Sequence, residues 1–229
     1  MILSQFMYSV QFNGLELMST VSDRRTRKRL ATRQSISDAA TRLFSERGFD
    51  RVTVDEIAKE ADVGRMTVFN HFARKEDMFF DLDGAAREDL RSALRASDPS
   101  LGVIEALRLF AHRIVAEQRP YARFFEGSRK FMETIAASET LKARARAIRD
   151  ELTSIVQEGV ALAAGRDQDD PDAHLAASLL VATWAAGFIQ AHRAYQQNQD
   201  GQEAQRVFLD VIDRGTHGVR TTMADTPFI

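Results

Sequence analysis

Apolar residues recur every three or four positions along most of the chain, which is the spacing of helices that bury one face. After Thr32 this stripe consists of Ile36, Ala39, Ala40, Leu43 and Phe44. Gly48 comes shortly afterwards, and glycine commonly ends a helix because it adopts the left-handed conformation without strain. The pattern predicts a first helix from about Thr32 to Arg47.

A second, shorter helix is predicted from its start signals. Thr53 can accept a hydrogen bond at the helix N-terminus, and Glu56, three residues later, completes a capping box. Val52 can pack against Ile57 across the first turn. These signals place the start of the helix at Val54.

A tight turn and a third helix follow. Asp62 tolerates a left-handed backbone, and Gly64 can cap the next helix. Val68 and Phe72 are four residues apart and share the inward face. The outward side then carries Met66 and Asn70, flanked by Thr67 and Phe69, with Arg65 at the helix start and His71 at the edge. Two short helices packed on a longer one form the layout that presents the last helix to the major groove of DNA.

The rest of the chain is predicted to be helical as well. Only four prolines occur, helix formers fill the intervals between them, and no segment alternates like a strand. Further helices are expected at residues 76–95, 102–117, 120–137, 139–164, 172–197 and 202–222. The predicted fold class is all-α, with about nine helices.

Composition places the protein among ordinary soluble globular chains, with 44% hydrophobic and 28% charged residues. Because cysteine is absent, disulfides and thiolate metal sites are excluded, and a cytoplasmic location is expected. The longest charge-free run, Leu175 to Ala191, is short and weakly apolar for a membrane span. We expect no membrane association and interpret this run as a helix buried on most sides.

The net charge is only −2, yet one short segment is strongly basic and contains no acid. Its basic residues are Arg24, Arg25, Arg27, Lys28, Arg29 and Arg33. Such a density attracts phosphate groups, although basic runs are commonly solvated tails. We expect residues 1–30 to form a flexible arm whose basic segment strengthens nucleic-acid binding through the release of counterions.

The run TVDEIAKEADVGRMTVFNHFARKEDM closely resembles the DNA-binding domain of the TetR family of bacterial regulators, and the resemblance covers roughly Thr32 to Leu82. The family pattern has a Thr-led second helix, an Ala-Gly-Val-Ser turn, and Thr-Leu-Tyr-x-His-Phe before a lysine. Three positions depart from it: Asp62 replaces the turn glycine, Gly64 the capping serine, and Phe69 the tyrosine. A phenylalanine cannot donate a hydrogen bond to a phosphate.

The resemblance implies that residues 31–82 form a DNA-binding domain whose third helix enters the major groove. It assigns positions at or near base edges to Arg65, Met66, Thr67 and Asn70. Arginine can read guanine and asparagine can read adenine, while Met66 and Phe69 can contact a thymine methyl group. Thr53, His71 and Lys75 would hold backbone phosphates. The alternative is that Arg65 and Asn70 are ordinary solvent-facing residues and that His71 belongs to the edge of the core.

For residues 83–229 the resemblance implies a larger helical domain that binds an effector and dimerises. The last two helices would pair with those of a second copy, which suits both the apolar run and the two half-sites of a palindromic operator. The effector would be an apolar or amphipathic small molecule. Candidate pocket residues are Phe110, Phe124, Phe125, Phe131, Trp184 and Phe188, although aromatic residues are equally expected in the core.

The sequence therefore favours a ligand-responsive repressor that binds double-stranded DNA as a homodimer. Its five histidines form no metal-binding pair, and neither a glycine-rich phosphate loop nor a Gly-x-Ser-x-Gly motif occurs. We expect no enzyme activity, catalytic residue, metal or cofactor. Two alternatives stay open: a helical protein that binds nucleic acid without sequence preference, and a helical-bundle enzyme.

Overall fold

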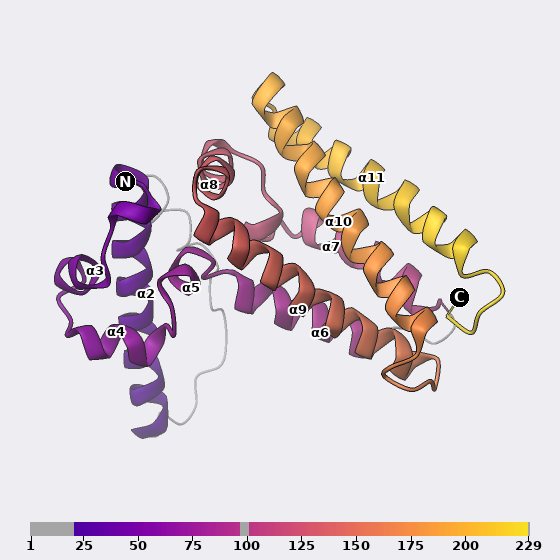
Figure 1. Ribbon diagram of the computed structural model, residues 1–229, viewed down its shortest axis with the longest axis horizontal. Coiled ribbons are helices and arrows are strands. Elements are labelled where there is room, and N and C mark those ends of the chain that lie inside the picture. The colour runs from indigo at the N-terminus through magenta and orange to yellow at the C-terminus, as the bar shows by residue number, and fades with distance from the viewer. Residues whose placement is uncertain (1–20, 97–100, 229) are drawn as a thin grey trace. The chain divides into compact units, whose positions relative to one another are not determined.

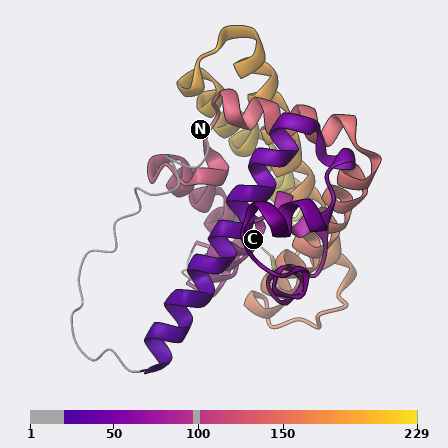
Figure 2. The same ribbon diagram turned by 90° about the vertical axis from the view of Figure 1, so that its left-hand side faces the viewer.

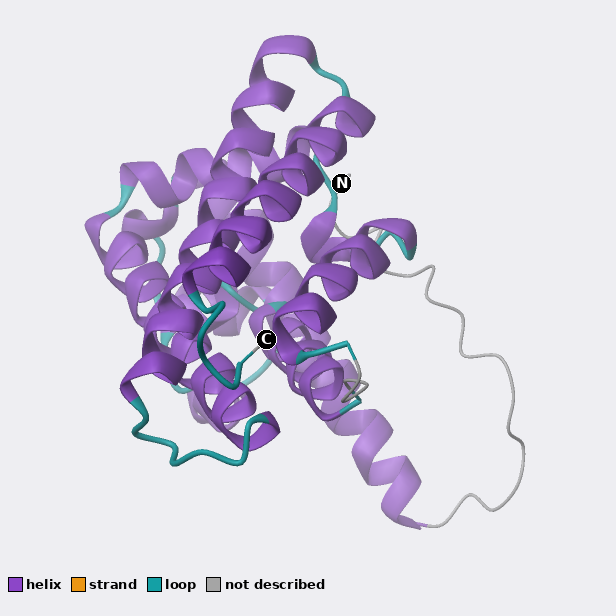
Figure 3. Cartoon of the chain, turned by 90° about the vertical axis from the view of Figure 1, so that its right-hand side faces the viewer, coloured by secondary structure: helices purple, strands orange, loops and turns teal. Residues whose placement is uncertain are grey.

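The computed structural model describes residues 21–96 and 101–228, which form α-helices, two short 3-10 helices and connecting loops, without a strand (Figure 3). They divide into two compact units, each with its own hydrophobic core. The first comprises residues up to Asp81 together with Thr134–Leu141, and the second comprises Leu82–Glu133 and the residues from Lys142 onward. The predicted all-α fold class is confirmed.

The first unit is built on the long helix α2 (Val21–Arg47), with α3 (Val54–Glu60), α4 (Arg65–His71) and α5 (Lys75–Phe79) packed on it (Figure 1). The 3-10 helix η2 (Phe49–Arg51) connects α2 to α3. Its core consists of apolar side chains from all of these elements, among them the predicted inward stripe of the first helix.

Local signals in the sequence set the helix ends of this unit. Gly48, directly after α2, has φ of 82°, and Asp62, in the turn after α3, has φ of 53°. Thr53 and Glu56 form the predicted capping box, and α3 begins at Val54. Each of these three predictions from turn and cap chemistry is confirmed.

The first helix begins at Val21 and not at Thr32, so residues 21–30 are helical and do not form part of a flexible arm. The remaining arm residues, 1–20, lie outside the described residues. Residues 24–31 are exposed, and the first turns of α2 extend beyond α3 and α4 (Figure 2). A helix without a buried face leaves no apolar period to detect, which is why the pattern missed these turns.

Two predicted helices are divided in the structure. The segment 76–95 contains α5 and α6 (Asp83–Arg95), and the segment 120–137 contains the 3-10 helix η3 (Pro120–Ala122) and α8 (Glu126–Ala137). The described residues consequently hold ten α-helices where about nine were predicted. Residues 134–141 were expected in the second domain, yet Leu141 is fully buried in the core of the first unit, where Ile135 packs against it.

The second unit contains α6, α7 (Val103–Ala116), most of α8 and of α9 (Glu139–Ala163), α10 (Pro171–Asn198) and α11 (Gly201–Thr222). α10 and α11 lie side by side along their lengths (Figure 1). Glycine permits this close approach, because a Cβ atom on Gly215 would lie 2.2 Å from Cγ2 of Thr183.

By length and mean hydropathy, α10 is also a candidate membrane span. Its side chains at Ala176, Leu180 and Ala191 are buried in the core of the second unit. However, only 28% of the most apolar 18-residue segment of α10 is buried within the chain. The prediction that this helix is buried on most sides is therefore wrong for a single copy. Leu175 and Ile189 are 42% and 44% exposed on the remaining side.

Candidate nucleic-acid interface

The start of α3 is held by three hydrogen bonds between two residues. The amide of Glu56 donates to Oγ1 of Thr53 at 3.3 Å, while the amide and hydroxyl of Thr53 both donate to Oε2 of Glu56 at 2.8 Å. These bonds from Thr53 hold the pKa of Glu56 below its usual value, with the backbone amide contributing most. α3 therefore begins at a fixed position ahead of the turn that leads to α4.

α4 has one buried and one exposed side. Val68 is fully buried and Phe72, directly after the helix, is 2% exposed, as the spacing predicted. Met66 is 72% exposed and Phe69 is 38% exposed, and Arg65 and Asn70 share their side of the helix. Thr67 and His71 lie at the edges and are partly buried. The four exposed residues thus form a continuous surface of the kind that can meet base edges.

Arg65 is held in place by neighbours on both helices. Its Nη1 donates to both carboxylate oxygens of Asp55, at 3.0 and 3.2 Å, and its guanidinium lies 5.6 Å from the centre of the Phe69 ring. Asp55 belongs to the first turn of α3. Arg65, the candidate for reading a base, is therefore an exposed side chain that is held by Asp55 and Phe69.

Two residues expected to hold phosphates use their donors inside the protein. Both the amide and the hydroxyl of Thr53 donate to Glu56, so a phosphate contact by Thr53 would require the capping box to open. Lys75 donates from Nζ to the carbonyls of Phe49 and Val52 at 3.1 and 3.0 Å, and it also lies over the Phe49 ring. An ammonium has three donors, so Lys75 retains one for a phosphate.

His71 ends α4 at the edge of the exposed surface. Burial lowers the pKa of His71 below its usual 6.5, and the positive charges of Arg29 and Arg33 lower it further. The ring is therefore mostly neutral at pH 7. A neutral imidazole can still donate one hydrogen bond to a phosphate, but it adds no charge to the interface.

Arg33 belongs to the basic run, yet its guanidinium is turned inward. Nη1 donates to the carbonyl of His71 at 2.7 Å, Nη2 pairs with Asp81 at 2.6 Å, and the group stacks on the Phe72 ring at 4.0 Å. Ser37 donates to the same Asp81 carboxylate at 2.8 Å. Arg33 thereby fixes the C-terminal end of α4, whereas the rest of the basic run lies exposed on the first turns of α2.

Asp55 and Asp81 shape this interface but were not expected from the sequence, and Arg33 was expected only as part of the basic run. Asp55 and Arg65 are ten residues apart, and Arg33 and Asp81 are 48 apart, so no helical period connects them. One weak signal existed for the second pair. Arg33 and Ser37 are four apart on one helix, which places both on the face that meets Asp81.

In the second unit, four of the six proposed pocket residues belong to one aromatic cluster. Phe110 stacks on Trp184 at 5.5 Å, and Phe188 lies 4.7 Å from the Phe208 ring, which Phe124 also approaches. Phe110 and Phe124 are 5% exposed, and Trp184 and Phe188 are partly buried. Phe125 and Phe131 are partly exposed and lie outside this core. The cluster is filled by its own side chains.

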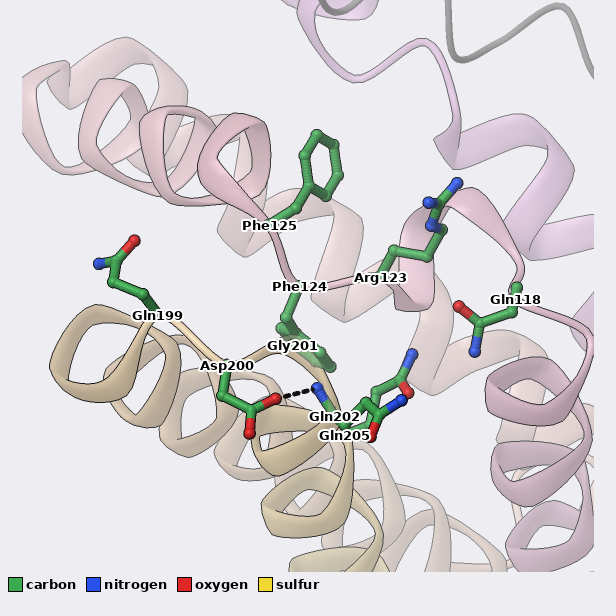
Figure 4. Close-up of a pocket in the computed structure, with 9 residues that line it drawn as sticks. All are labelled: Gln118, Arg123, Phe124, Phe125, Gln199, Asp200, Gly201, Gln202 and Gln205. Atoms are coloured by element: carbon green, nitrogen blue, oxygen red, sulfur yellow. Dashed lines mark hydrogen bonds between the residues drawn. The ribbon is translucent and has the colours of Figure 1, made fainter.

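A cavity of about 350 Å³ lies beside this cluster, between the loop before α8 and the α10–α11 turn (Figure 4). Of the proposed pocket residues, Phe124 and Phe125 line it, and the ring of Phe125 points away from the glutamine side chains. Gln118, Gln202 and Gln205 gather at one side. The cavity is thus more polar than the predicted aromatic pocket.

No group of three or more histidine, aspartate or glutamate side chains within residues 21–96 and 101–228 is arranged to hold a metal ion.

Comparison with known proteins identifies the first unit. Residues 36–82 match the family model described as bacterial regulatory proteins, tetR family. The HTH-type transcriptional regulator YhgD of Bacillus subtilis is 26% identical over 129 residues, which is 55% of this chain and 67% of that protein. The HTH-type transcriptional repressor BepR of Brucella suis is 37% identical over 99 residues, or 38% of this chain and 47% of the repressor. The aligned region of BepR is thus about half of that relative.

The fold of the whole chain resembles that of a solved regulator. SmeT in complex with triclosan superposes with a TM-score of 0.55 at 21% identity, over 82% of this chain and 91% of SmeT. SmeT is described as the repressor of the Stenotrophomonas maltophilia multidrug efflux pump SmeDEF. At this identity the likeness concerns the fold, which extends through both units. Residues 36–82 thus match the tetR family of bacterial regulatory proteins, and the fold of the chain is similar to that of SmeT.

Proposed function

We propose that the protein is a sequence-specific transcriptional repressor that binds a palindromic operator as a homodimer and leaves it when a small molecule binds. The observation that carries this proposal is α4, which buries Val68 and exposes Arg65, Met66, Phe69 and Asn70. Arginine and asparagine are the residue types that pair with guanine and adenine edges in the major groove. The exposed basic turns of α2 add affinity for phosphates that is independent of sequence.

The outward side of α10 supports the homodimer. Leu175 and Ile189 are large apolar residues exposed on this helix, and Ala182 and Ala186 between them are exposed as well. Small side chains between larger ones allow a second helix to approach closely. Two copies joined here would present two α4 helices to the two halves of a palindrome. Ile189→Glu should therefore yield monomers that bind the operator at least about tenfold more weakly, because the apolar contact would bury a charge.

Two features of the second unit support the proposed response to an effector. The aromatic cluster next to a polar cavity suits an amphipathic small molecule, which would enter by displacing rings that now pack on one another. SmeT, which has a similar fold, was solved with triclosan bound. From SmeT we infer for this protein only that it responds to a small molecule. The molecule would act because it binds one state of the dimer more tightly than the other. As for other regulators of this family, we infer a cytoplasmic location and no enzymatic activity.

Selection of bound sequences from random DNA tests the proposal directly. The full-length protein should enrich one palindrome with half-sites about 10 base pairs apart, centre to centre, and should still prefer it at salt that abolishes binding to random DNA. A matched selection with Asn70→Ala should lose the preference at one position in each half-site. Enrichment of no sequence at any salt would favour the alternative, a helical protein that binds nucleic acid without sequence preference.

A further inference from the structure

We propose that Asp55 determines sequence specificity by holding Arg65 so that one edge of its guanidinium reads guanine. Asp55 lies outside the helix that presents the reading surface, and it would act through Arg65 without contacting a base. The inference rests on the proposed function, because it assigns a positioning role within the same DNA-binding surface.

The guanidinium of Arg65 is tethered at two points. Both carboxylate oxygens of Asp55 accept from Nη1, at 3.2 and 3.0 Å, and the Phe69 ring lies 5.6 Å below the central carbon. One tether comes from the first turn of α3 and the other from the next turn of α4. Because the Thr53–Glu56 capping box fixes the start of α3 and both helices pack on the core of the first unit, the tethers define one direction for a long and otherwise mobile side chain.

The contacts of Arg65 leave one edge of its guanidinium group available to pair with a base. Asp55 takes only Nη1, and the hydrogen bonds of Arg65 within the described residues involve neither Nε nor Nη2. These two nitrogens carry parallel N–H groups along one side of the guanidinium. O6 and N7 of guanine are two neighbouring acceptors in the major groove. A single guanine can therefore pair with the free edge while Asp55 keeps the other.

The negative charge of Asp55 gives the proposal a distinctive signature. Arg65 and Asp55 are 60% and 63% exposed, so their ion pair contributes little to stability, and a neutral substitution will fold. A carboxylate at this surface repels the phosphate backbone of any DNA. Loss of the charge should therefore strengthen binding to random DNA, while loss of the tether should weaken the choice of guanine. A residue that only stabilised the fold would do neither.

The test compares two full-length variants that each remove one negative charge from α3. Asp55→Asn loses the carboxylate that holds Arg65, whereas Glu60→Gln loses one that pairs with Arg42 at 2.7 Å. For each variant and the wild type, dissociation constants are measured for the selected operator, for operators with each guanine replaced, and for random DNA. Both variants should bind random DNA more tightly to a similar degree. Only Asp55→Asn should reduce the preference for guanine at one position of each half-site, by about fivefold.

A third variant keeps the test independent of how Asp55→Asn folds. Arg65→Lys retains the positive charge but lacks the two-donor edge, so it should lose the same guanine preference, and adding Asp55→Asn to it should change that preference no further. Equal base preferences in Asp55→Asn and Glu60→Gln would overturn the inference. It would also be overturned if the selected operator contained no guanine whose preference is lost in the Arg65→Lys variant. If the wild type selects no operator, the proposed function fails as well, and the two failures are thereby distinguished.

Discussion

The two units of this protein fix their helices by different means. In the first, α3 and α4 have seven residues each, too few to be stable alone. The Thr53–Glu56 capping box holds the start of α3, and Arg33 holds the end of α4 by donating to the His71 carbonyl. In the second, α10 and α11 have 28 and 22 residues and are joined by interlocking aromatic side chains. Polar anchoring lets α4 keep one whole side exposed, whereas aromatic packing fills the interior of the second unit with its own rings.

The largest effect is expected in the aromatic cluster. Phe208 is fully buried and its ring lies 4.7 Å from that of Phe188, so Phe208→Ala should lower the free energy of unfolding of the second unit by about 3–5 kcal/mol. Phe208→Leu, which preserves most of the volume, should cost less than half as much. Thermal unfolding followed through Trp184 fluorescence measures both. Equal losses in the two variants would contradict the packing account.

The second effect concerns the polar anchor of α4. Arg33→Ala removes the bonds to the His71 carbonyl and to Asp81, and because the side chain is 38% exposed we expect a cost of about 1–2 kcal/mol. Hydrogen exchange should become faster at the amides of α4 and stay unchanged in α10. Arg29→Ala, from the exposed part of the same basic run, is the matched control and should affect only DNA binding. If Arg33→Ala made amide hydrogen exchange faster in both units, the proposed difference in how the two units fix their helices would be contradicted.

A smaller effect is expected at the start of α3. Thr53→Ala removes the capping hydroxyl and should destabilise the first unit by about 1 kcal/mol, while Thr53→Ser should be close to neutral. Since Thr53 directs its donors to Glu56, the folded Thr53→Ala variant should bind random DNA as tightly as Thr53→Ser does. Weaker binding to random DNA by Thr53→Ala than by Thr53→Ser would instead show that this hydroxyl contacts a phosphate.

The smallest effect is on the pH dependence of the second unit. Burial against the Phe124 ring lowers the pKa of His192, although its bond to the Phe188 carbonyl opposes the shift. The unfolded state then binds more protons than the folded state below pH 6.5, so stability falls as the pH drops through that value. Between about pH 7.5 and about pH 5.5, His192→Asn should lose less thermal stability than the wild type. The control variant His217→Asn, which replaces an exposed histidine, should lose as much thermal stability over this pH range as the wild type does. If His192→Asn also loses as much as the wild type, His192 is not the cause of the pH dependence.

The same comparison explains what could be predicted from the sequence. Gly48, the Thr53 and Glu56 pair, and Asp62 act over a few residues, so their chemistry is readable along the chain, and the starts of α3 and α4 followed from such local signals. The predicted faces of α4 followed from helical spacing, which requires only that Val68 and Phe72 be buried.

Predictions that depend on distant partners were less complete. The inward turn of Arg33 needs Asp81, and the donors of Lys75 need two carbonyls more than twenty residues away, so both looked like phosphate-seeking cations in the sequence. The aromatic residues of the second unit were recognised as a group. Their division between the packed cluster and the cavity beside it depends on how α7, α10 and α11 meet, which composition does not encode.

The central claim is that the exposed side of α4 reads base sequence while the rest of the first unit positions it and adds affinity that is independent of sequence. The ratio of the dissociation constants for random DNA and for the selected operator tests this claim most directly, measured at one salt concentration for the wild type and for Arg65→Ala. We predict that Arg65→Ala weakens operator binding by about 1–3 kcal/mol and weakens binding to random DNA much less, through the loss of one charge, so that the ratio falls several-fold. An equal loss on both DNAs would contradict the account, because Arg65 would then contribute charge alone.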